Sequence, residues 1–156
     1  MSSQHVSIDV AAPPAVVYDL LADITRMPDW SPEVTRCAWL GGATQATPGA
    51  RFRGWSRKGW RRWSTLSTVS QADRPERFEW RVRFAGLPVA TWRYGFTAAD
   101  AHRTTITETV IDQRGRLLRQ MSPFITGSRN RQARNDETMH VTLERLKDAA
   151  ERTSSR

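Results

Sequence analysis

The spacing of apolar residues changes once along this chain, and that change limits the possible folds most strongly. From residue 34 to residue 112, apolar and polar side chains alternate with a period of two, which is typical of β-strands with one buried face. From about Ser128 to Glu151, Met139, Leu143 and other apolar residues recur every three or four positions, which predicts one long helix with a narrow apolar stripe. Many strands followed by a single helix favour a sheet that wraps around the helix and leaves a cavity between them.

Turn signals divide residues 34–112 into about six strands. These signals are short groups rich in Gly, Pro and Asp, and they occur at residues 41–42, 48–49, 58–59, 73–75, 86–88 and 100–102. The clearest strand covers residues 77–84, where Phe78, Trp80 and Val82 alternate with charged residues. An earlier alternating segment, residues 5–10, adds a strand, so the sequence predicts a curved antiparallel sheet of about seven strands.

Two short helices are predicted between the first and second strands. Residues 14–22 carry apolar side chains three and four positions apart, with Pro14 in the first turn. Pro28 and Pro32 then restrict residues 23–30 to a second, shorter helical segment. The predicted fold class is therefore α+β, with one domain expected over residues 1–156.

Residues 113–127 are harder to interpret, because apolar residues at helical spacing are interrupted by Pro123. One interpretation is that Ser122 caps a helix whose first turn contains Pro123. In that case the long helix would begin there and bend near Gly127.

The formal charge of +8 comes almost entirely from arginine, since Lys58 and Lys147 are the only lysines. The arginines are spread along the chain without a helix-turn-helix, zinc-finger or RNP-like pattern, so we expect a solvated basic surface and no nucleic-acid partner. Three dispersed histidines and the single Cys37 provide no metal-ligand pattern, and no cofactor is expected. Without a signal-like or membrane-length apolar segment, the expected location is the cytoplasm.

Five segments carry a resemblance to a known superfamily. They are residues 11–18 (AAPPAVVY), 23–30 (DITRMPDW), 48–52 (PGARF), 105–109 (TITET) and 142–147 (TLERLK). With these segments and its order of elements, the chain resembles the START/Bet v1-like (SRPBCC) superfamily, in particular its bacterial polyketide cyclase/dehydrase and lipid-transport branch. The resemblance implies a helix-grip fold with a deep apolar cavity that holds a lipid, polyketide or similar hydrophobic molecule.

The seven tryptophans supply more aromatic bulk than a small closed core requires. The candidate ligand-binding residues of the cavity are Trp30, Trp55, Trp63, Trp80, Trp92, Tyr94, Phe96, Glu108, Asn135 and Met139. For each tryptophan, filling the core is the simpler alternative.

Glu108 is the most informative polar residue, because the alternation in residues 104–112 turns it toward the apolar face. A carboxyl group in that position needs a hydrogen bond, a cation or a raised pKa. It could orient a ligand hydroxyl or act as a catalytic base together with Tyr94. The alternative is an internal salt bridge to an arginine on an adjacent strand, such as Arg93 or Arg53.

Three functions follow, and binding of a small hydrophobic ligand is favoured. The first alternative is an enzyme of the polyketide cyclase type that uses acid/base catalysis. Cyclases of the resembling group place an arginine on a central strand over the cavity, whereas here residues 63–68 carry no arginine and only Arg61 and Arg62 precede them. This departure weakens the cyclase interpretation.

The second alternative is lipid transfer at a membrane interface. Residues 113–127 place Arg114, Arg116 and Arg119 beside apolar residues such as Leu117 and Phe124, which favours weak contact with an anionic membrane. The sequence is compatible with a monomer or a homodimer.

Overall fold

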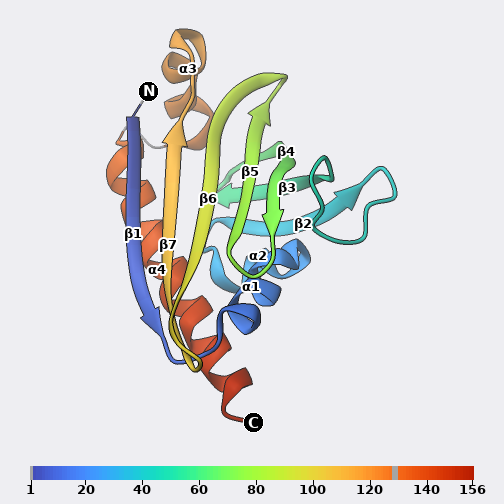
Figure 1. The fold of residues 1–156 in the computed structure, drawn as a ribbon. Coiled ribbons are helices and arrows are strands. Elements are labelled where there is room, and N and C mark those ends of the chain that lie inside the picture. Colours follow the sequence, from blue (N-terminus) through green and yellow to red (C-terminus); the bar gives the residue numbers. More distant parts are fainter. Residues whose placement is uncertain (1, 128–129) are drawn as a thin grey trace.

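The computed structural model describes residues 2–127 and 130–156, which form a curved sheet with helices on one side (Figure 1). The elements in chain order are β1 (Ser2–Val10), α1 (Pro14–Ala22), the 3₁₀ turn η1 (Ile24–Arg26), α2 (Met27–Trp30), β2 (Val34–Leu40), β3 (Arg51–Lys58), β4 (Arg61–Asp73), β5 (Arg77–Phe84), β6 (Leu87–Asp100), β7 (Arg103–Asp112), α3 (Arg116–Thr126) and α4 (Arg131–Ser154). The predicted helix-grip architecture is confirmed.

The seven strands form one antiparallel sheet in the order β1-β7-β6-β5-β4-β3-β2. Strands β2 to β7 follow one another as hairpins, and the last strand, β7, pairs with the first strand, β1. The register places Tyr94 on β6 opposite Glu108 on β7, and Trp80 on β5 opposite Trp92 on β6. Side chains that alternate toward the concave face therefore form continuous rows across the sheet.

Helix α4 runs along this sheet and packs against β1, α1 and α2 (Figure 1). Its buried stripe contains the predicted residues Met139, Leu143, Leu146 and Ala150. The predicted start at residue 128 lies outside the described residues. The described helix begins at Arg131. Asn130 caps it, because its side chain accepts a 3.1 Å hydrogen bond from the backbone N–H of Ala133.

Residues 113–127 differ from the interpretation in which Ser122 caps the long helix. They form the separate helix α3, and Ser122 lies inside it, buried, where its Oγ accepts a hydrogen bond from Arg114. The helix continues through Pro123 at the loss of one backbone donor. It ends at Gly127, whose left-handed conformation (φ = 75°) lets its N–H donate to the carbonyl of Pro123 at 2.8 Å.

Large buried side chains pack around the C-terminal half of α4. Tyr18 on α1 packs edge-on against Phe96, with ring centroids 5.6 Å apart, and also contacts Phe78. The side chains of Leu21 and Leu146 are fully buried in the same core.

None of the described helices is long and apolar enough to cross a bilayer.

Candidate functional site

An interior cavity lies between the concave face of the sheet and the N-terminal half of α4. Its aromatic wall is formed by Phe52, Trp63, Trp80, Trp92 and Tyr94, from strands β3 to β6. The cavity volume is about 140 Å³. A cavity of roughly this size accepts benzene, whereas drug-sized ligands occupy about 300 Å³ or more. The structure therefore offers room for one ring, which is less than the deep cavity that the resemblance implied.

Six of the predicted residues line this cavity, namely Trp63, Trp80, Trp92, Tyr94, Glu108 and Asn135. Trp30, Phe96 and Met139 are instead buried in the surrounding core, each with at most 4% of its surface exposed. Their packing matches the alternative in which such residues fill the interior. The role of the six lining residues in ligand binding stays a prediction.

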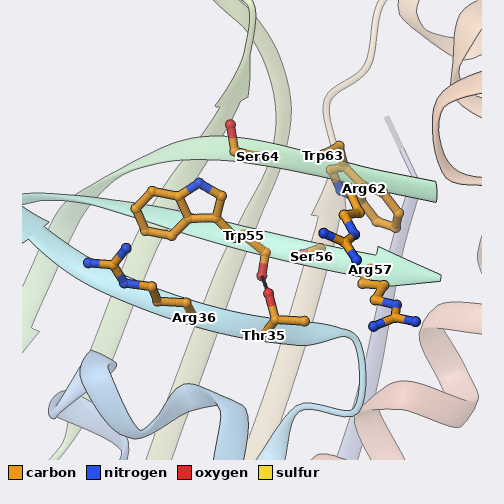
Figure 2. A pocket seen from close by; sticks show the side chains of 8 residues that line it. All are labelled: Thr35, Arg36, Trp55, Ser56, Arg57, Arg62, Trp63 and Ser64. Carbon is orange, nitrogen blue, oxygen red and sulfur yellow. Dashed lines mark hydrogen bonds between the residues drawn. The ribbon is translucent and has the colours of Figure 1, made fainter. Parts of the chain in front are cut away.

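Trp55 lies on the opposite, convex face of the sheet (Figure 2). The inward positions of β3 are taken by Phe52, Gly54 and Ser56, so the alternation turns Trp55 outward. There it lies under the guanidinium of Arg36, 4.7 Å from its ring, in a hollow also lined by Arg57 and Arg62. Figure 2 shows Arg36 beside the indole at one side of this hollow and the other two arginines at the other.

Glu108 is the central polar group of the interior cavity, with 2% of its surface exposed. The Tyr94 hydroxyl donates a hydrogen bond to Oε1 of Glu108, while Oε2 has no hydrogen-bond partner among the described residues. Burial raises the pKa of Glu108 to about 8, although the hydrogen bond from Tyr94 acts in the opposite direction. The carboxyl is therefore mainly protonated at neutral pH and can present an O–H donor to the cavity.

The predicted salt bridge between Glu108 and Arg93 or Arg53 is wrong. Both arginines occupy outward positions of their strands. Arg93 pairs with Glu79 at 2.6 Å, and Arg53 donates to Ser64 at 3.3 Å. Strand alternation thus separates these cations from Glu108 by the thickness of the sheet, and burial acts on the Glu108 carboxyl without a compensating charge.

On the polar side of the cavity, sequence reasoning identified Asn135 but missed the residues around it. Arg131, Asn135, Thr138 and Thr142 line it from α4, and Glu33 lines it from the segment before β2. Glu33 accepts hydrogen bonds from Arg134 and from Thr138. The signal was present in the spacing, because positions 131, 135, 138 and 142 fall on one face of a helix, beside the apolar stripe.

The chemistry open to this site is that of a neutral carboxylic acid beside an aromatic wall. Within residues 2–127 and 130–156, no three His, Cys, Asp or Glu side chains gather where they could hold a metal ion. Cys37 also lines the cavity, but burial raises the pKa of its thiol to about 12, so it is not a ready nucleophile. His140 is exposed on α4 and faces Asp136 at 3.6 Å. Glu108 with Tyr94 can instead hydrogen-bond a ligand oxygen or exchange a proton with it.

Comparison with solved structures supports the same fold. The chain is similar to the ZhuI aromatase/cyclase from Streptomyces sp. R1128, with a TM-score of 0.71 and 18% identity over 97% of this chain and 95% of that one. It is also similar to a START superfamily protein from Mycobacterium smegmatis, with a TM-score of 0.70 and 12% identity over 97% and 98% of the two chains.

A third similar structure is the di-domain ARO/CYC StfQ from the steffimycin biosynthetic pathway, with a TM-score of 0.70 and 16% identity. The match covers 98% of this chain but 46% of that protein, so the chain spans less than half of its length. At these identities the likeness concerns the fold alone.

The comparison with curated proteins gives no match. The sequence model of the family described as "Polyketide cyclase / dehydrase and lipid transport" matches residues 1–151, which is nearly the whole chain. Together with the helix-grip architecture, this match shows that the chain belongs to the polyketide cyclase/dehydrase and lipid transport family.

Proposed function

We propose that this protein binds a small, mostly apolar molecule that carries a carbonyl or hydroxyl group facing Glu108. The observation that carries this proposal is the Oε2 atom of Glu108, which is buried in a cavity with aromatic walls and has no partner in the described part of the chain. A buried polar atom without a hydrogen bond is costly, and a ligand oxygen would supply that bond. The family match supports the binding of a hydrophobic molecule.

Binding can be tested by native mass spectrometry of the purified protein and by fluorescence titration with one-ring aromatic alcohols, ketones and acids. Trp63, Trp80 and Trp92 line the cavity, so an occupant should change their emission. We expect a saturable change with one molecule bound per chain. A protein that carries no extractable small molecule and shows no saturable response to any probe would contradict the proposal.

A second candidate function is catalysis of the cyclase or dehydratase type, and the Glu108–Tyr94 hydrogen bond in the cavity favours it. A neutral carboxyl next to a buried phenol can assist enolisation or loss of water from a confined ketone. The 140 Å³ volume favours binding over the cyclisation of a multi-ring substrate. Normal turnover by a Glu108→Gln variant would refute this assignment.

A third candidate function is lipid handling at an anionic membrane surface, favoured by the exposed face of α3. Leu117, Met121 and Phe124 lie on that face with 61%, 44% and 81% of their surfaces exposed, and Arg116 and Arg119 flank them. Such a face suits an interfacial helix. Flotation with vesicles of phosphatidylglycerol and phosphatidylcholine at low salt tests it, with Phe124→Ser as the weakened variant. Absence of binding by the wild-type protein would remove this function.

A further inference from the structure

Arg131 lies between the interior cavity and the protein surface. It is the first residue of α4, and its Nη1 atom is buried without a hydrogen-bond partner among the described residues. It lines the interior cavity and also a surface hollow beside β1 and β7 that contains Arg114 and Arg119. Asn135 is likewise shared by the two. This pair of side chains therefore forms the boundary across which a ligand could pass from the surface hollow to the aromatic wall.

The acidic groups near Arg131 already have other partners. Glu33 forms an ion pair with Arg134, and Asp112 forms one with Arg114 at 2.7 Å. In the described part of the chain, no carboxylate lies within ion-pair distance of Arg131. Three guanidinium groups, those of Arg114, Arg131 and Arg134, thus share two carboxylates, which leaves one positive charge in excess.

An unpaired guanidinium in a mostly buried position has a strong tendency to attract an anion. Removal from water is unfavourable for its charge, and arginine keeps that charge at any physiological pH. Its planar fork also matches the two oxygens of a carboxylate. The N-terminus of the 24-residue helix α4 adds backbone N–H groups and the positive end of a helix dipole on the same side.

We propose that the ligand of the interior cavity is an acid: a one-ring aromatic or similarly compact apolar molecule whose carboxylate pairs with Arg131 while its ring lies against the tryptophan wall. This inference rests on the proposed binding function and specifies its ligand class. The cavity volume limits the ring system to one ring. In the surface hollow the charge of Arg114 is offset by Asp112, and Arg119 supplies a further positive charge that attracts such an anion toward the cavity.

The test uses two pairs of probes with matched shape, benzoate with benzamide and 4-hydroxybenzoate with 4-hydroxybenzamide, at pH 7. Within each pair the shape is nearly constant and the negative charge is present in one member alone. Calorimetric titration of the wild-type protein should give at least tenfold tighter binding of the acid than of the amide. The preference should decrease as salt concentration rises.

Two variants locate the effect. Arg131→Gln removes the charge and keeps a shorter, polar side chain, and it should bring the acid to the affinity of the amide. Arg145→Gln removes an exposed arginine from the same helix and should leave the preference intact. Arg131→Gln should also melt no lower than the wild-type protein without ligand, because it removes a buried charge that has no carboxylate partner in the described structure.

The outcomes separate this inference from the function on which it rests. If the amides bind as tightly as the acids, or if Arg131→Gln retains the preference, the assignment of Arg131 is overturned while the binding function stands. If Arg131→Gln melts well below the wild-type protein, Arg131 supports the fold and the ligand assignment is overturned as well. If no probe of either pair binds, the proposed binding function fails and the acid assignment fails with it.

Discussion

Replacing Glu108 by Gln keeps the shape of the protonated side chain but removes its titration. The amide oxygen can still accept the hydrogen bond from Tyr94, and the amide N–H₂ can occupy the place of the carboxyl O–H. Any difference between the two proteins that depends on pH therefore reports the ionisation of Glu108.

The sign and size of the effect follow from the two pKa values. The pKa of Glu108 is about 8 in the folded protein, against an ordinary value of 4.5 that applies once the chain unfolds. Between these values the unfolded chain has released the proton and the folded chain retains it, so rising pH favours unfolding. The stabilisation is complete below about pH 4.5 and is lost as pH rises through 8. From pH 5 to pH 9 the loss amounts to about 4 kcal/mol.

The assay is urea unfolding at pH 5, 7 and 9, followed by circular dichroism. The free energy of unfolding of Glu108→Gln minus that of the wild-type protein should rise by about 4 kcal/mol across this range. Glu137→Gln, which changes an exposed glutamate of α4, is the matched control and should follow the wild-type curve. Parallel curves for Glu108→Gln and the wild-type protein would refute the buried, protonated carboxyl on which the site is built.

Three further predictions concern the surroundings of this group. Tyr94→Phe removes the donor that lowers the pKa of Glu108, so the pH at which stability is lost should move above 8. The same unfolding series would detect this shift. A shift of that pH to a lower value would contradict the prediction. Gly54→Val places a Cβ at an ordinary contact distance of 3.6 Å from Cys37 Sγ and should fill part of the cavity. Probe binding should weaken at least several-fold in a fluorescence titration, while the melting temperature stays the same or rises. Unchanged affinity would place the ligand elsewhere. Asn130→Ala removes the cap of α4 and should cost about 1 kcal/mol in urea unfolding; no loss would show that the cap contributes nothing.

The sequence predicted those features that depend on a regular period. Alternation along β7 correctly turned Glu108 inward, and the stripe on α4 correctly identified Met139 and Leu143 as buried. Trp55 was misplaced because its bulk suggested an inward position, whereas the smaller Gly54 and Ser56 hold the inward positions of β3. An apolar count gives little weight to glycine and serine, although the register of the strand depends on every residue.

The salt bridge proposed for Glu108 failed for a different reason. Arg93 was chosen because it lies on a strand adjacent to Glu108, but the face of the sheet to which it points was not considered. The pairing of Arg93 with Glu79 depends on the register of the assembled sheet. Arg131 was missed because a guanidinium at the start of a helix usually lies in solvent. Its burial depends on β1, β7 and the segment before β2, which are far from it in sequence. Contacts of this kind follow from tertiary packing and leave no local pattern.

The two halves of helix α4 have different roles, one in packing the core and the other in lining the cavity. Its C-terminal half packs into the aromatic and aliphatic core around Tyr18 and Leu146, and its N-terminal half forms one wall of the cavity. Substitutions at small inward residues such as Gly54, Thr65 and Ser67 can therefore reshape the cavity while the core around Tyr18 and Leu146 stays unchanged. A scaffold with this division can acquire new ligands by single substitutions during evolution, because one part of the core keeps its packing while the cavity changes shape.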